Sequence, residues 1–180
     1  MEPNIEITRD QRIESAYSKL VMNLDDMTKS YRALLDLVRK EKEFLLAADL
    51  EKIQETNLNK ETILFKVRAL DVARERHAKD LAAHVGGDVE NPRLLELAQK
   101  LSGTDKGESL RQMHSTLELL VRRASELNRE NEGYANAALK NLNGALDNIK
   151  GTLSGKSTYE NKGKMAYGPQ KSGNFVRREG

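Results

Sequence analysis

The stretch IESAYSKLVMNLDDMTKSYRALLDLVRKEKEFL, residues 13–45, carries a regular hydrophobic pattern. Apolar residues recur along it in alternating steps of four and three: Ile13, Tyr17, Leu20, Leu24, Met27, Tyr31, Leu34, Val38 and, beyond Glu41, Leu45. This spacing places the side chains along one side of an α-helix, as in coiled coils. Because no proline or glycine occurs between Pro3 and Gly86, we predict a helix over about residues 9–48. Such a helix needs partners to cover its apolar stripe.

A second helix is predicted over about residues 50–84. Asp49 is suited to cap its first turn, and Glu51 carries a negative charge where the helix dipole favours one. Its apolar row is interrupted by Thr56 and Lys60, so we expect its first half to pack loosely. The row consists of Ile53, Ile63, Leu64, Val67, Leu70 and Leu81.

The segment HVGGDVENPRLLELAQKLSGTDKG, residues 84–107, reads as a connector. Asn91 and Pro92 are helix start signals, so we predict a short helix at about residues 92–101, followed by a loop. A last long helix is predicted over about residues 108–150. Its apolar row contains Leu110, Met113, Leu117, Leu120, Ala124 and Leu127, then Asn131, Tyr134, Ala138, Leu142, Ala145 and Ile149. Gly133, Gly144 and several asparagines make its second half a weaker helix.

The predicted fold class is all-α, with a long antiparallel helical hairpin or three-helix bundle in residues 1–150. Residues 151–180 are expected to form a flexible, disordered tail, because six glycines and scattered apolar residues cannot bury enough surface to offset the entropy of ordering. This tail holds six Lys or Arg and two acidic residues, a net charge of +4, while the rest of the chain carries −2.

Composition argues against an enzyme. Charged residues make up 32% of the 180 residues and aromatic residues only 4%, which is typical of exposed helices. There is no cysteine, no P-loop and no Gly-x-Ser-x-Gly motif, so we expect no catalytic activity and no cofactor. The polar start MEPNIEITRD lacks the plan of a signal peptide, and no apolar run approaches the length of a membrane span. We therefore expect a cytoplasmic protein that does not insert into membranes.

The three histidines do not suggest a metal site. His77 and His84 are seven residues apart, which is about 10 Å along a helix and too far for a shared ion. The Glu-x-x-His signature of di-iron bundles is absent. A histidine phosphotransfer domain is an alternative, but no basic residue follows closely behind His84 to steady a phosphoryl group.

The tail contains three aromatic residues, Tyr159, Tyr167 and Phe175, spaced eight apart. Isolated aromatic residues in flexible chain suit docking into pockets of a partner. A purely solvating appendage is the alternative reading. Contact with nucleic acid is a further one, but +4 over 30 residues is a low charge density, and we expect no nucleic-acid partner.

Two motifs together resemble the FlgN family of flagellar export chaperones. The first is FLLAADLEKIQETNLNKETILFKVRALDVAR, residues 44–74, with Asp49 and Leu50 at the turn and Asn59, Lys60 and Glu61 before an apolar run. The second is TYENKGK, residues 158–164, which is similar to the C-terminal Tyr-x-x-x-Gly motif of that family. The resemblance extends over about residues 10–168.

The resemblance implies a non-enzymatic, cytoplasmic chaperone. It would bind the hook-filament junction proteins FlgK and FlgL and deliver them to the type III export gate, which includes FlhA. Carried onto this sequence, it places cargo binding on Tyr134, Ala138, Leu142, Ala145, Ile149 and Leu153. It places docking to the export gate on Tyr159, Gly163 and Tyr167.

Two further classes stay open on the sequence alone. A coiled-coil structural or stator-like adaptor would have a last helix that is rigid to its end and a tail that can be removed without loss. A nucleic-acid adaptor would bind with an affinity that falls steeply with salt.

Overall fold

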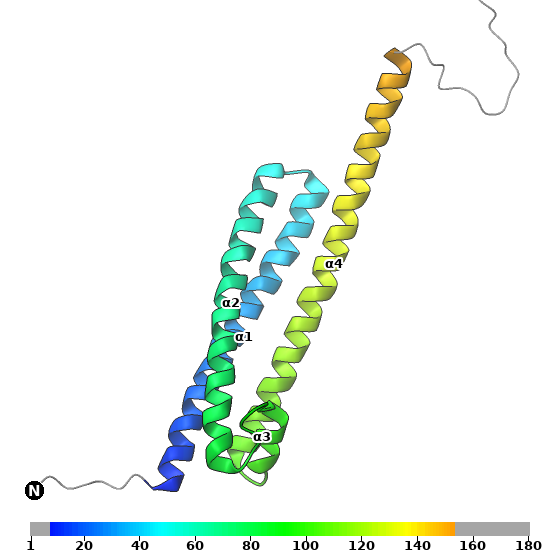
Figure 1. Ribbon diagram of the computed structural model, residues 1–180. Coiled ribbons are helices and arrows are strands. Elements are labelled where there is room, and N and C mark those ends of the chain that lie inside the picture. Colours follow the sequence, from blue (N-terminus) through cyan, green and yellow to red (C-terminus); the bar gives the residue numbers. More distant parts are fainter. Residues whose placement is uncertain (1–7, 154–180) are drawn as a thin grey trace, which may run out of the picture. The chain divides into compact units, whose positions relative to one another are not determined.

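The structure is a computed structural model that describes residues 8–153. It contains α1 (Arg9–Ala47), α2 (Leu50–Val85), α3 (Leu94–Lys100) and α4 (Asp105–Leu153), and no strand within the described residues (Figure 1). The predicted all-α class is therefore confirmed. The expected disordered tail lies, from residue 154 on, outside the described residues. The domain boundary at residue 150 stays a prediction.

The chain divides into two compact units, Met1–Ala138 and Leu139–Gly180. The first unit contains α1, α2, α3 and α4 as far as Ala138. The described part of the second unit is the end of α4, residues 139–153. The two units are described separately below.

The helical hairpin of α1 and α2 begins and turns at side-chain caps. Thr8 and Gln11 form a reciprocal capping box at the start of α1, where the Thr8 Oγ1 accepts a hydrogen bond from the Gln11 N–H at 3.4 Å. At the turn, Ala48 adopts a left-handed conformation with φ of 54°. Asp49 then caps α2, its carboxylate accepting a hydrogen bond from the Lys52 N–H at 3.2 Å. The predicted cap at Asp49 is confirmed.

The apolar stripe of α1 forms the centre of the core in the first unit. Leu20 and Leu24 are fully buried, and they pack with Leu81 of α2, Leu97 of α3 and Leu110 of α4. A second cluster lies farther along α1 and contains Leu34, Leu35, Val38, Ala124 and Leu127. The first half of α2 adds little to either cluster, in line with the polar residues in its row. Its Leu50, Leu58 and Phe65 side chains are exposed.

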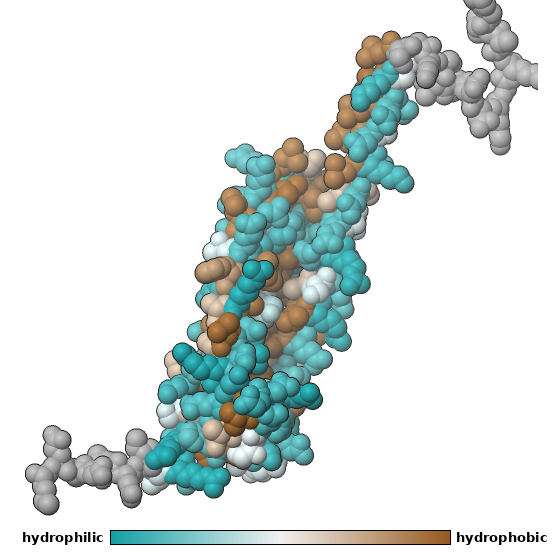
Figure 2. All heavy atoms as spheres, in the orientation of Figure 1, coloured by the Kyte–Doolittle hydropathy of each residue, from teal (hydrophilic) through white to brown (hydrophobic). Residues whose placement is uncertain are grey.

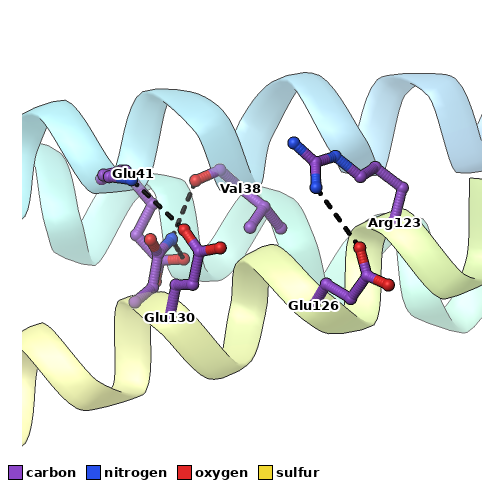
Figure 3. A network of polar contacts seen from close by, with 7 residues as sticks. Val38, Glu41, Arg123, Glu126 and Glu130 are labelled. Carbon is purple, nitrogen blue, oxygen red and sulfur yellow. Dashed lines mark hydrogen bonds and ion pairs between the residues drawn. The ribbon is translucent and has the colours of Figure 1, made fainter.

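A polar cluster joins α1, α2 and α4 where their apolar rows are interrupted. Figure 3 shows Val38 and Glu41 of α1 facing α4 in this region. Lys60 Nζ of α2 lies 2.6 Å from Glu41 Oε1 of α1. The Asn131 side-chain amide of α4 donates hydrogen bonds to Glu41 Oε2 at 2.9 Å and to the Val38 carbonyl at 2.8 Å. We call Glu41, Lys60 and Asn131 the polar cluster. Glu41 thus contacts two of the polar residues that interrupt the apolar rows of α2 and α4.

The last long helix begins at Asp105, three residues before the predicted start. The Thr104 hydroxyl accepts a hydrogen bond from the Gly107 N–H at 3.4 Å, which caps the first turn. Gly107, read from the sequence as part of a loop, is therefore helical. A Cβ atom at this position would lie 2.5 Å from the Leu101 carbonyl oxygen and 2.7 Å from that of Ala98. Only glycine lets α4 start this close to the end of α3.

Gly107→Ala is therefore expected to destabilise the protein by about 1–3 kcal/mol, because the contacts are to backbone atoms that cannot rotate away. Gly133→Ala is the matched control, since a Cβ atom there meets nothing within 4 Å. The control should instead stabilise the protein by about 0.5–1 kcal/mol through lower chain entropy in the unfolded state. Urea unfolding of both variants measures the difference. Equal midpoints would show that α3 and α4 do not meet closely at Gly107.

Candidate protein-binding surface

The described part of the second unit presents hydrophobic side chains that nothing covers within residues 8–153. These are Leu139, Leu142, Leu146, Ile149 and Leu153, which are 45–83% exposed. They recur in steps of three and four, so they share one side of α4. Figure 2 shows hydrophobic side chains along this segment beside hydrophilic ones. We call these five residues the exposed row.

The predicted cargo-binding residues fall partly within the exposed row. Leu142, Ile149 and Leu153 belong to it, and Ala145 is an exposed neighbour on the same helix. Tyr134 and Ala138 belong to the first unit, where both are exposed. The Tyr134 ring also lies 5.3 Å from the Lys42 ammonium group in a cation–π contact.

Sequence reasoning missed Leu139 and Leu146. The predicted apolar row ran through Ala138 and Ala145, whereas the large exposed side chains belong to their neighbours Leu139 and Leu146. The alternation of three and four residues from Leu139 to Leu153 was the signal that could have found them. Whether the exposed row or the predicted set binds a partner stays a prediction.

The chemistry of the exposed row suits another amphipathic helix. The charged residues of this segment, Lys140, Asp147 and Lys150, lie away from the centre of the row by helical spacing. Gly144 has open space around it, so its lack of a side chain serves no packing contact. This part of α4 is therefore a segment that a partner could reshape at low cost.

The predicted export-gate residues, Tyr159, Gly163 and Tyr167, lie outside the described residues. Within residues 8–153, no helix combines the length and hydropathy that crossing a membrane requires.

The histidines offer no metal cluster in the part of the chain that the structure describes. Burial in the first unit lowers the pKa of His77, and the nearby Arg76 and Lys19 act in the same direction. His84 shares a cavity of about 400 Å3 with Arg9 and Arg12, so the fold brings it basic neighbours that are distant in sequence. However, the Asp80 carboxylate lies 3.6 Å from His84 Nε2 and would repel a phosphoryl group there.

The described residues thus form an all-helical protein, with a hairpin, a further long helix and an uncovered apolar row at the end of that helix. A family model described as FlgN protein matches residues 16–166. Because this match covers most of the chain, the chain belongs to the FlgN family. Comparisons with curated proteins and with solved structures give no significant match. Membership of the FlgN family supports a general role as a flagellar export chaperone.

Proposed function

We propose that this protein binds FlgK- and FlgL-like hook-filament junction proteins in the cytoplasm and delivers them to the FlhA component of the export gate. In this proposal the protein is not an enzyme and uses no cofactor. Membership of the FlgN family, together with the exposed row at the end of α4, is the observation that carries the proposal.

The proposed mechanism is the pairing of two amphipathic helices. A cargo terminal helix whose apolar side would otherwise self-associate lays that side against the exposed row. Burying a leucine-sized side chain contributes about 1.5–3 kcal/mol, so the five side chains can supply a useful affinity after the cost of ordering both helices. Polar residues on the far side of α4 keep the complex soluble.

Gate docking is assigned to the segment after α4. Tyr159, with Gly163 and Tyr167, supplies an aromatic anchor that is separate in sequence from the exposed row. A separate anchor allows the chaperone to hold cargo and to contact the gate at the same time. Because the two sites are distinct, they can be tested independently.

Two titrations with wild-type protein and Tyr159→Ala test this function. The wild-type protein should bind a terminal helix of FlgK or FlgL and, once loaded, the cytoplasmic domain of FlhA. Tyr159→Ala should keep its cargo affinity but lose about 2 kcal/mol in binding to FlhA, the size of an interface anchor. Tyr159→Phe is the control and should lose less, because most of the buried area remains.

Three outcomes would contradict the proposal. If the wild-type protein bound neither FlgK nor FlgL segments, cargo capture would be wrong. If Tyr159→Ala weakened both titrations equally, the tyrosine would belong to the cargo site. If it weakened neither, the assignment of gate docking to Tyr159 would be wrong.

A further inference from the structure

A groove runs along the first unit between α2 and α4, with α1 as its floor. Two cavities of about 700 Å3 and 470 Å3 are both lined by Tyr31 and Val121, so they form one continuous depression. The apolar residues that line it include Met27, Tyr31, Leu34 and Val38 on α1, Leu64 on α2 and Val121 on α4. We call this depression the α2–α4 groove. In Figure 2, hydrophobic side chains are visible between these helices, with hydrophilic ones on either side.

The walls of the groove leave apolar surface open to solvent. Residues of α2 and α4 line the two cavities together, and α2 packs along α1. The floor residues Met27, Leu34 and Val38 are buried, but Leu64 and Val121 on the walls are 42% and 39% exposed. A helix laid between the walls would cover both side chains without displacing core residues.

The charged side chains around the groove are mainly basic. Five basic residues line its two cavities, against two acidic residues, Glu118 and Glu132. The five are Lys60, Arg74, Arg93, Arg122 and Arg129. Each acidic side chain contacts a neighbour on α4, since Glu118 lies 3.9 Å from His114 and Glu132 accepts a hydrogen bond from Asn128.

Two of the basic residues have no ion-pair partner within residues 8–153. Three of the five are paired: Arg74 with Asp71, Arg122 with Glu126 and Lys60 with Glu41. Arg93 and Arg129 are exposed, and neither forms an ion pair there. Arg93 lines the first cavity and Arg129 the second, so an uncompensated positive charge borders each.

We propose that the α2–α4 groove binds an acidic amphipathic helix of a protein partner. Its apolar side would cover Tyr31, Leu64 and Val121, and its acidic residues would face Arg93 and Arg129. The groove lining on α4 extends from His114 to Glu132, about 27 Å of helix, which corresponds to a partner helix of about 18 residues.

Charge argues against the chain's own C-terminal segment as the occupant, because residues 151–180 carry a net charge of +4. The groove lies entirely within the first unit and does not include the exposed row. Occupation of the groove therefore does not depend on the proposed cargo site, and a chaperone of this design can hold two different helices.

Two synthetic helical peptides of about 20 residues test the inference. They share one apolar row and differ only in having Glu or Lys at the flanking positions. Titrated into the full-length protein by fluorescence anisotropy, the Glu peptide should bind at least about tenfold more tightly than the Lys peptide. The difference should shrink as salt is raised, because ions screen exposed charges. Equal affinities for the two peptides would overturn the proposal.

Charge-reversal variants locate the peptide. Arg93→Glu/Arg129→Glu should weaken binding of the Glu peptide at least about tenfold. Arg32→Glu/Arg68→Glu is the matched control, because it makes the same charge change at exposed arginines that do not line the groove. Equal losses in both double variants would show a general charge effect and overturn the proposal.

Two single variants separate the groove from the exposed row. Val121→Trp, at an exposed position on the groove wall, should prevent binding of the Glu peptide while leaving circular dichroism unchanged. Leu142→Asp should leave this binding intact. Loss of Glu-peptide binding in Leu142→Asp alone would place the peptide on the exposed row and overturn the assignment to the groove, whatever the outcome for FlgK and FlgL segments.

Discussion

Lys60→Met is expected to lower the free energy of unfolding by about 3 kcal/mol. The Lys60 and Glu41 side chains are only 15% and 9% exposed, and their charged atoms are 2.6 Å apart. Removing the ammonium group leaves the Glu41 carboxylate buried without its cation, which typically costs about 3–5 kcal/mol. The residual exposure and the hydrogen bond from Asn131 place the expected loss at the low end of this range. Urea unfolding followed by circular dichroism measures it.

Two further variants establish the cause. Lys42→Met removes an ion pair with Glu130 whose acidic side chain is 49% exposed, so it should cost at most about 1 kcal/mol. Glu41→Leu/Lys60→Met removes both buried charges and should regain most of the loss, since Asn131 keeps its hydrogen bond to the Val38 carbonyl. A double variant as unstable as Lys60→Met would show that the loss comes from the lysine methylenes and not from the stranded carboxylate.

Leu142→Asp is expected to weaken binding of a FlgK or FlgL terminal helix by at least about 100-fold. The change removes about 1.5–3 kcal/mol of apolar burial and adds the cost of desolvating an unpaired carboxylate in the contact. Each 1.4 kcal/mol corresponds to a tenfold change in affinity. Because Leu142 is 58% exposed in the free protein, folding should be unaffected. Isothermal titration calorimetry measures the affinity.

Leu119→Asp is the matched control for this prediction. Leu119 is a leucine of α4 with nearly the same exposure, 55%, but it lies in the first unit and outside the exposed row. It should leave cargo affinity within about threefold of wild type, as is usual for surface changes away from an interface. Similar affinities for Leu142→Asp and the wild-type protein would remove the exposed row from the cargo site.

The long helices of this protein could be predicted from sequence because their signals are local. The stripe from Ile13 to Leu45 requires a helical partner whatever follows, and Asp49 marks the turn by its own side chain. The start of α4 could not be predicted in the same way. By its intrinsic propensity, glycine disfavours a helix. Glycine is needed at position 107 because the backbone at the end of α3 lies too close for a Cβ atom, and that proximity arises only in the folded structure.

The candidate sites also differ in whether they depend on local sequence patterns or on contacts between helices. The apolar spacing from Leu139 to Leu153 is a local pattern. The sequence therefore predicted three of the five residues of the exposed row, although it included Ala138 and Ala145 in place of Leu139 and Leu146. The α2–α4 groove combines residues from three helices and the connector, so no single segment of the sequence reveals it. From the sequence, Thr56 and Lys60 were interpreted as interruptions of the apolar row of the second helix. The ion pair between Lys60 and Glu41 is a contact between two helices, so the sequence pattern does not reveal it.

The polar cluster also fixes the register of the three helices. Apolar rows that repeat every seven residues can slide past one another by a heptad and still bury leucines. A shift of α2 along α1 would separate Lys60 from Glu41, and a shift of α4 would separate Asn131 from Glu41, so either shift would leave buried polar groups without partners. Asn131 is also the last buried residue of α4 as far as Leu153. The alignment that the cluster sets therefore also determines how many residues of α4 follow its last buried position, and the proposed cargo site lies among them.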